Sequence, residues 1–232
     1  MSLPNVQQKG EKIVLYGPNG VGKSAIINAM IAAIKPHYRS VETIAIDKTG
    51  LNIQLPNCRG DLVVLHIDEV KARQIGDKGC YVFGTDTVYF AGELGLFAVH
   101  CPEVARRLYL EVYYDKARED LNWIPIRNLS YGQKRRLAIE AALATGDFVA
   151  IENFEAGLHV DYVADIIKQM AESDAAVVLE THSGLVLRLA MRYGLPAYYI
   201  EQGARRIERL DDVELFQREL SAYQAVVPHG GG

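Results

Sequence analysis

The chain has 232 residues, a formal net charge of −4 and 49% hydrophobic residues. This length suits one large α/β domain with a good core, and the acidic balance argues against a broadly basic surface that coats nucleic acid, although a local basic patch stays compatible with it. No apolar run approaches the ~20 residues of a membrane span, and the N-terminus lacks a signal-peptide pattern. We therefore expect a cytoplasmic protein without membrane insertion.

Three cysteines, Cys58, Cys80 and Cys101, are spread along the chain without a CxxC pair. This spacing indicates no zinc site and is typical of a chain in a reducing compartment. We expect all three to be lone thiols.

The first predicted elements are a strand over residues 11–16 and a helix from Gly22 to about Ile34. The loop between them, residues 17–24, fits the pattern G-x-x-x-x-G-K-[ST] at every fixed position. A strand, this loop and a helix in that order predict a nest of backbone N–H groups that binds phosphate at a helix N-terminus. A glycine-rich turn without a ligand would need neither the lysine nor the serine, so the sequence predicts nucleoside triphosphate binding.

Two side chains of this loop carry specific expectations. Lys23 is expected to reach the β- and γ-phosphates and to lie exposed at the loop–helix junction, whereas the Ser24 hydroxyl is expected to ligate Mg²⁺. The predicted phosphate-binding residues are Asn19, Gly20, Val21, Gly22, Lys23 and Ser24.

Hydrophobic periodicity and turn residues predict the remaining elements. Strands are expected at 41–46 and 51–55 (paired), 62–67, 81–90 (a strand or a hairpin turning at Gly84), 148–151, 176–180, 197–201 and 205–210, with the last two closing a sheet edge. Helices are expected at 102–121, from Ser130 to about Leu143, at 160–171 and at 211–227.

The second informative stretch is Leu129-Ser130-Tyr131-Gly132-Gln133, in which Ser130 suits a helix cap. It resembles, with one difference, the LSGGQ signature of ABC-type ATPases. In that family the signature serine and glycines grip the γ-phosphate of ATP held by the other subunit's P-loop. The resemblance implies that Ser130, Gly132 and Gln133 bind ATP in an ATP-dependent homodimer.

Two later stretches are similar to the compact AAA-type branch of the same ABC-like ATPases. An apolar strand followed by Glu152, Asn153, Glu155 and then Gly-Leu-His resembles the Walker B and D-loop of that branch. His182, within Thr-His-Ser, looks like its switch histidine. The resemblance covers residues 11 to about 200.

This chain departs from the family pattern at the Walker B acids. Glu152 stands where the family has the aspartate that holds the Mg²⁺-bound water, and Asn153 stands where it has the catalytic glutamate. Asparagine can orient a water but cannot take its proton, and general-base help is typically worth roughly 10²–10⁴ in rate. Slow hydrolysis is therefore expected unless Glu155 or His182 takes over the water.

The family also places a glutamine between P-loop and signature to sense Mg²⁺ and water. Gln54 and Gln74 both fit this role, and we favour Gln54 because it ends an apolar strand. The metal ligands that the resemblance implies are Ser24, Gln54 and Glu152.

Asp68-Glu69, after the strand at 62–67, gives an alternative Walker B. If that pair held the metal, the chain would be a RecA- or AAA+-like NTPase, and the signature and Thr-His-Ser stretches would be accidental. A chance match at the single Asp68-Glu69 pair is simpler than chance matches at three stretches in family order, so Glu152 is favoured.

The expected fold is an α/β P-loop NTPase of ABC type with a mostly parallel central sheet, an antiparallel β portion near 41–90 and a helical subdomain at about 93–145. Residues 1–227 should form one domain and 228–232 a flexible tail. The expected function is a Mg²⁺-dependent ATPase that acts as a nucleotide switch on an unidentified protein partner or on DNA. A nucleotide-gated binding module without turnover and a transporter's nucleotide-binding subunit are the alternatives.

Overall fold

A computed structural model describes residues 10–34, 43–46, 51–54, 58, 61–67, 78–93 and 129–226. The predicted helix at 102–121, the Asp68-Glu69 pair, Gln74, Cys101 and the tail at 228–232 lie outside these residues. Only the last part of the expected helical subdomain falls within them, so that subdomain stays a prediction. Within the described part of the chain, no helix is long and apolar enough to cross a membrane.

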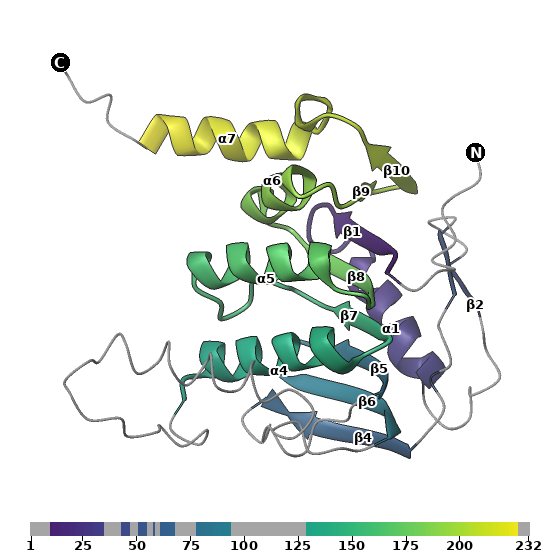
Figure 1. The fold of residues 1–232 in the computed structure, drawn as a ribbon. Coiled ribbons are helices and arrows are strands. Elements are labelled where there is room, and N and C mark those ends of the chain that lie inside the picture. Colours follow the sequence, from purple (N-terminus) through teal and green to yellow (C-terminus); the bar gives the residue numbers. More distant parts are fainter. Residues whose placement is uncertain are drawn as a thin grey trace, which may run out of the picture.

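The described elements include five successive strands, β2 to β6, and then strands and helices that alternate from β6 to β9 (Figure 1). They are β1 (Lys12–Tyr16), α1 (Lys23–Ile34), β2 (Thr43–Ile46), β3 (Leu51–Gln54), β4 (Asp61–His66), β5 (Lys78–Phe83), β6 (Thr87–Glu93), α4 (Tyr131–Thr145), β7 (Phe148–Ile151), α5 (Val160–Glu172), β8 (Ala176–Thr181), α6 (Gly184–Arg192), β9 (Ala197–Ile200), β10 (Ala204–Ile207), a 3-10 turn (Leu210–Asp212) and α7 (Glu214–Val226).

Eight strands form one sheet in the order β10-β9-β1-β8-β7-β5-β6-β4. The five strands from β9 to β5 run parallel, whereas β10 pairs antiparallel at one edge and β6 and β4 pair antiparallel at the other. Strands β2 and β3 form a separate antiparallel pair. The predicted α/β class, the mostly parallel sheet and its antiparallel portion are confirmed.

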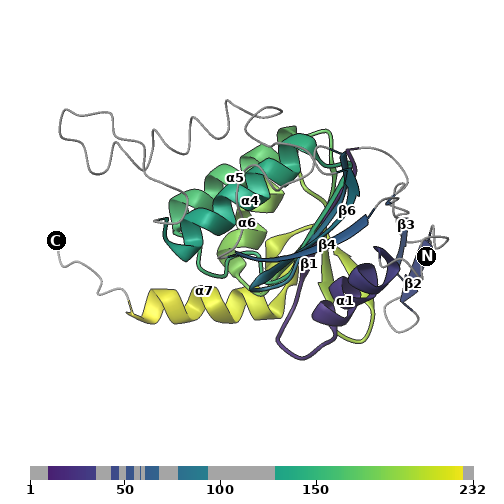
Figure 2. The same ribbon diagram turned by 90° about the horizontal axis from the view of Figure 1, so that it is seen from below.

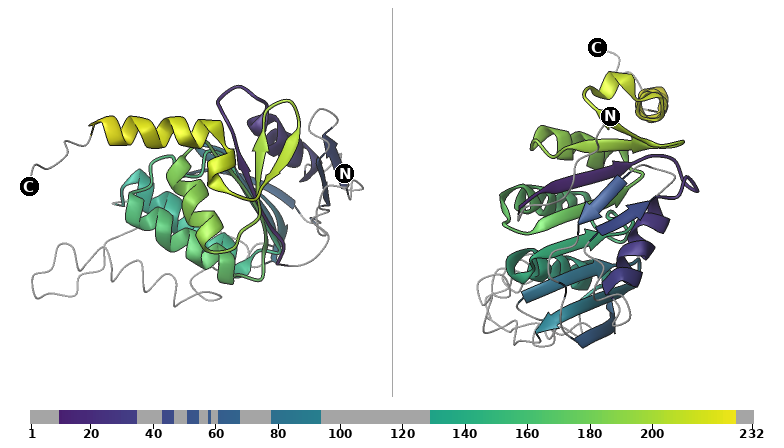
Figure 3. Two further views of the ribbon diagram at one scale, coloured as in Figure 1. Left: turned by 90° about the horizontal axis from the view of Figure 1, so that it is seen from above. Right: turned by 90° about the vertical axis from the view of Figure 1, so that its right-hand side faces the viewer.

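Helices cover both faces of the parallel part of the sheet (Figure 2). Helix α1 packs on one face, and α4, α5 and α6 pack side by side on the other, so each face closes its own apolar core. Every residue of β7 and β8 is buried, as is usual for parallel strands covered on both sides. Helix α7 lies at the β9–β10 end of the sheet (Figure 3).

Most predicted element positions agree with the structure, including the hairpin of β5 and β6 around Gly84. The nine-residue helix α6 was not predicted, because it follows the Thr-His-Ser stretch directly and spans too few turns for a clear period. The final helix begins at Glu214 rather than Asp211, after the 3-10 turn.

Cys58 and Cys80 are joined by a disulfide, with their Cα atoms 5.3 Å apart. The expectation of three lone thiols is therefore wrong for this pair. Cys80 is buried within β5, and the fold brings the segment after β3 beside it. The sequence separation of 22 residues gave no sign of this proximity, because it depends on the placement of strands that are not adjacent in the sequence.

We predict that Cys58→Ser lowers the free energy of unfolding by roughly 3 kcal/mol in oxidising buffer, because the disulfide reduces the conformational entropy of the unfolded chain. Denaturant unfolding of wild type and variant measures the difference. In buffer with a strong thiol reductant the two proteins should unfold alike. Equal stability in both buffers would show that the pair does not constrain the chain in solution.

Candidate nucleotide-binding site

The phosphate-binding loop has the backbone that its glycines predict. It connects the end of β1 at Tyr16 to the start of α1 at Lys23. Gly20 and Gly22 have φ angles of 80° and 100°, in the left-handed region where a side chain is strained. Glycine adopts both of these φ angles at little energetic cost. The loop can therefore fold tightly and lead directly into the N-terminus of α1.

Lys23 is buried, with 4% of its surface exposed, so the expectation of an exposed lysine is wrong. Its Nζ donates hydrogen bonds to the carbonyls of Gly17 and Pro18, at 2.8 and 2.7 Å, and lies 3.6 Å from Oε1 of Glu180. The side chain folds inward because these oxygens satisfy its charge. Burial lowers the pKa of Lys23, and the carboxylates of Glu180 and Glu155 oppose that shift.

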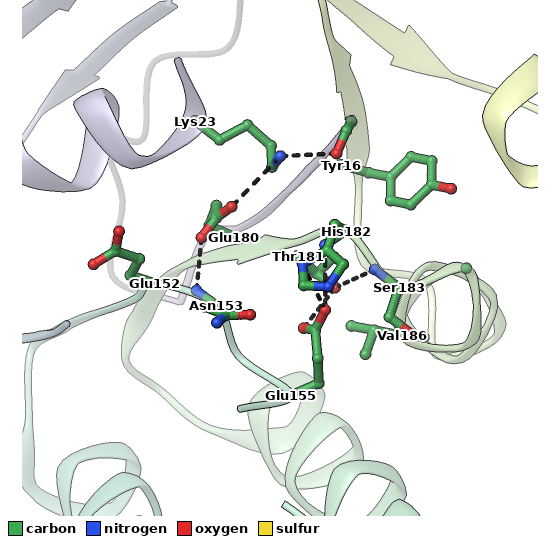
Figure 4. A network of polar contacts seen from close by, with 12 residues as sticks. Tyr16, Lys23, Glu152, Asn153, Glu155, Glu180, Thr181, His182, Ser183 and Val186 are labelled. Carbon is green, nitrogen blue, oxygen red and sulfur yellow. Dashed lines mark hydrogen bonds and ion pairs between the residues drawn. The ribbon is translucent and has the colours of Figure 1, made fainter. Parts of the chain in front are cut away.

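Glu180 joins the lysine to the turn that follows β7 (Figure 4). Its Oε2 accepts a hydrogen bond of 2.6 Å from the backbone N–H of Asn153. Asn153 has a φ of 45°, a left-handed conformation that asparagine tolerates better than most residues, and its Oδ1 is buried without a partner among the described residues. Glu180 was missed at the sequence level, although an acid inside an apolar, buried strand was an available signal.

Glu155 and His182 are brought into contact, with Nδ1 of His182 3.2 Å from Oε1 of Glu155. The same carboxylate accepts hydrogen bonds from the Thr181 hydroxyl at 2.8 Å and from the His182 backbone N–H at 3.3 Å. Both residues line a hollow of about 550 Å³, shared with Ser183 and residues of α7. Glu155 therefore serves to orient the Thr-His-Ser stretch.

Glu152 follows β7, and its backbone N–H is held by the carbonyl of Phe83 at 2.8 Å. Its carboxylate is partly exposed and the Ser24 hydroxyl lies on an exposed residue at the start of α1. Oxygen donors of these two kinds fit Mg²⁺, which is commonly bound by one or two side chains together with substrate phosphates. The described residues include no group of three or more histidines, cysteines, aspartates or glutamates that could hold a metal ion.

Two further candidates for the metal, Gln54 and the Asp68-Glu69 pair, occur at other points of the chain. Gln54 ends β3, in the separate two-stranded sheet. Strand β4, which the Asp68-Glu69 pair follows in the sequence, lies five strand positions from β1, or roughly 24 Å, whereas β7 lies two positions away. The strand order therefore favours Glu152 over the alternative Walker B.

The signature stretch forms a reciprocal cap at the start of α4. Ser130 Oγ accepts from the Gln133 backbone N–H at 3.3 Å, and Gln133 Oε1 accepts from the Ser130 backbone N–H at 2.9 Å. A hollow of about 340 Å³ opens beside this cap, lined by Ser130, Gly132, Gln133, Gly157, His159, Asp161 and Tyr162. None of these lining residues belongs to the phosphate-binding loop.

Gly132 fits at this cap because it has no side chain. A Cβ atom there would lie 2.1 Å from the carbonyl oxygen of Gly157, a distance that real contacts do not reach. The first turn of α4 therefore packs directly on the Gly-Leu-His turn, so the signature and D-loop stretches form one surface.

Arg135 is a residue that the sequence reasoning missed. Its guanidinium is fully buried and donates to the carbonyls of Gly84 at 3.0 Å, Glu152 at 2.8 Å and Asn153 at 3.2 Å, as well as to that of Thr85. Burial lowers its pKa from the usual arginine value. The forked side chain of Arg135 thus attaches the turn after β7, which contains both Walker B positions, to the helix α4 that follows the signature stretch.

Comparison with known proteins gives a family and several relatives. The sequence model of the AAA_21 family, described as "AAA domain, putative AbiEii toxin, Type IV TA system", matches residues 54–189, more than half of the chain. "Phosphonates import ATP-binding protein PhnC 2" of Nostoc sp. is 28% identical over 207 residues, which cover 84% of this chain and 79% of the relative.

"Putative ABC transporter ATP-binding protein" of Bacillus cereus is 27% identical over 203 residues, which cover 84% of this chain and 33% of the relative. This chain spans about a third of the length of the curated relatives that head the comparison. A crystal structure of a nucleotide-free ATP-binding cassette from an ABC transporter is 17% identical, with a TM-score of 0.45 over 97% of this chain and 90% of that one.

We predict that Lys23→Ala removes most of the affinity for nucleotide and also destabilises the fold, by roughly 3 kcal/mol. The second effect is expected because the change leaves the Glu180 carboxylate buried without its cation. Calorimetric titration with ATP and denaturant unfolding measure the two effects. Unchanged ATP affinity in a folded variant would refute the assignment of the phosphate-binding loop.

We also predict that Arg135→Lys lowers the free energy of unfolding by roughly 2–3 kcal/mol, because a single ammonium cannot reach all the carbonyls that the guanidinium holds. Arg192→Lys, at an exposed position near the end of α6, is the matched control and should change stability little. If both variants unfold like the wild type, the buried fork does not hold the Walker B turn.

Proposed function

Because the chain belongs to the AAA_21 family and is an ABC-type P-loop ATPase domain, we propose that it is a nucleotide switch in which two copies close over two Mg²⁺–ATP molecules. The observation that carries the proposal is that one chain has two separate candidate surfaces for phosphate, which share no residue. The loop with Lys23 lies at the end of β1, and the signature hollow at the start of α4 includes none of that loop's residues.

The signature hollow is suited to a phosphate that another chain supplies. It contains the N-terminus of a fifteen-residue helix, where backbone N–H groups favour an anion, and the Ser130 and Gln133 side chains line it. An ATP bound by one chain's loop would complete this hollow in the partner. That arrangement makes association dependent on nucleotide.

In this site Ser24 and Glu152 would hold Mg²⁺, which supplies charge neutralisation for the phosphates. Asn153 stands beside them with its Oδ1 available to position a water, but its amide takes no proton. We therefore propose that hydrolysis is slow unless another carboxylate accepts the proton, with closed dimers that persist while ATP is bound. The same asparagine supports the alternative of a binding module without turnover.

The partner of the switch is proposed in general terms only. The resemblance of the Gly-Leu-His and Thr-His-Ser stretches to the compact branch favours a protein partner or DNA. The name of the phosphonate-import relative suggests a transporter subunit as the competing class. An ATPase assay with and without DNA, and co-purification with a membrane protein, separate these classes. A cytoplasmic location stays a prediction, and the Cys58–Cys80 disulfide is an observation against a strongly reducing compartment.

The dimer is tested with Ser130→Arg. The wild type should associate only with Mg²⁺–ATP, whereas the variant should bind ATP as a monomer with nearly normal affinity, since arginine's bulk and charge fill the hollow that receives the partner's nucleotide. Gel filtration with light scattering measures both proteins. Ser221→Arg, on the exposed side of α7, is the control and should dimerise normally. A wild type that stays monomeric at every Mg²⁺–ATP and protein concentration would contradict the proposal.

A further inference from the structure

Glu180 occupies the centre of the site without belonging to any stretch that the function has used so far. Strand β8 lies between β1, which leads to the phosphate-binding loop, and β7, which leads to Glu152. Glu180 pairs in register with Leu15 of β1, one residue before Thr181. Glu180 is 5% exposed, in a strand whose preceding residues are all apolar.

The two oxygens of this carboxylate face the two groups on which hydrolysis depends. Oε1 lies 3.6 Å from Nζ of Lys23, and Oε2 accepts the backbone N–H of Asn153 at 2.6 Å. The backbone carbonyl of Glu180 also accepts from the N–H of Phe154 at 3.0 Å, so β8 is tied to the turn after β7 at both backbone and side chain. Figure 4 shows this carboxylate between Lys23 and the pair Glu152 and Asn153.

We propose that Glu180 is the general base for ATP hydrolysis, supplying the carboxylate that Asn153 lacks; this inference rests on the proposed function. Lys23 is held by Glu180 and by two loop carbonyls, and the phosphates of ATP carry more negative charge than those groups together. Binding of ATP draws Lys23 onto the phosphates. Glu180 then loses its cation beside Asn153 and becomes able to accept a proton.

The chemical step is a displacement at the γ-phosphorus. The oxygen of a water positioned by Asn153 forms a bond to that phosphorus, and the bond from the phosphorus to the bridging oxygen breaks, leaving its electron pair on ADP. The proton released by the water passes to the Glu180 carboxylate. It leaves later to inorganic phosphate or solvent, which restores the carboxylate and its pair with Lys23.

The other acids near the site are engaged elsewhere. Glu155 accepts from the Thr181 hydroxyl and pairs with His182, which ties both of its oxygens. Glu152 fits the Mg²⁺ role, and its backbone is fixed by Phe83 and Arg135. Glu180 is the acid that contacts Asn153 directly.

The test compares Glu180→Gln with Glu172→Gln, which removes an exposed carboxylate at the end of α5. Glutamine keeps an oxygen for the Asn153 N–H, so the fold should persist. We expect kcat for ATP to fall on the order of 10²-fold in Glu180→Gln, with ATP affinity unchanged or tighter because Lys23 has lost a competitor. Glu172→Gln should match the wild type in both measurements. Glu180→Asp, whose carboxylate is set back by one methylene, should keep part of the rate.

The dependence of kcat on pH separates a base from a residue that only holds the site in shape. The charged and titratable groups drawn with Glu180 in Figure 4 are Tyr16 of β1, Lys23 of α1, Glu152 and Glu155 after β7, and His182 after β8. In wild type and Glu180→Asp the rate should fall as the solution is acidified, because a base must be unprotonated to act. In Glu180→Gln this acid limb should be lost, whereas a structural role would lower the rate at every pH and leave the profile unchanged.

The outcomes distinguish this inference from the function on which it rests. Wild type that neither binds ATP nor dimerises with it contradicts the proposed function itself. Wild type that binds ATP and dimerises, yet hydrolyses it at the same rate as Glu180→Gln or not at all, overturns the role of Glu180 and leaves the switch intact. If Glu180→Gln does not fold, Glu180→Asp decides alone, and wild-type kcat and pH profile in that variant would overturn the proposal.

Discussion

The structure around the candidate site depends on one buried ion pair, between Lys23 at the start of α1 and Glu180 in the central strand β8. Neither charge could be buried alone without a large desolvation penalty, so each requires the other. Because Glu180 also holds the Asn153 backbone, the pair links the phosphate-binding loop to the turn that carries the Walker B positions. A ligand that attracts Lys23 must therefore alter the environment of Asn153.

Arg135 makes the corresponding link on the other face of the sheet. Its buried guanidinium connects the signature helix to the carbonyls of Glu152 and Asn153, from the side opposite to Glu180. The turn after β7 is thus held between a carboxylate that binds its N–H and an arginine that binds its carbonyls. This arrangement gives the left-handed Asn153 a fixed conformation and couples the nucleotide loop to the surface proposed to meet the second copy.

Much of this could be predicted from the sequence, because the motifs depend on local geometry. Gly20 and Gly22 have positive φ angles that suit glycine, Ser130 and Gln133 cap a helix from within four residues, and fully apolar runs predict strands buried on both faces. The choice of Glu152 over Asp68-Glu69 as the Walker B acid stays a prediction, which the place of β7 two positions from β1 in the sheet favours.

What could not be predicted depends on contacts between distant segments. Lys23 was expected to be exposed, and it is buried because Glu180 lies 157 positions further along the chain and meets it across neighbouring strands. Arg135 reaches Gly84 over 51 positions, and Cys58 meets Cys80 through strand placement. In each case the partner could not be predicted from the residue type, because the two residues come close together only when the whole sheet has formed.

The most direct measurement is a crystal structure of the protein with Mg²⁺ and a non-hydrolysable ATP analogue. The account predicts two chains related by a two-fold axis, with Lys23 of each on the β- and γ-phosphates, Glu180 separated from Lys23 but still bound to Asn153, and Ser130 of the opposite chain at the γ-phosphate. An analogue bound away from residues 17–24, or bound there while Lys23 keeps its pair with Glu180, would contradict it.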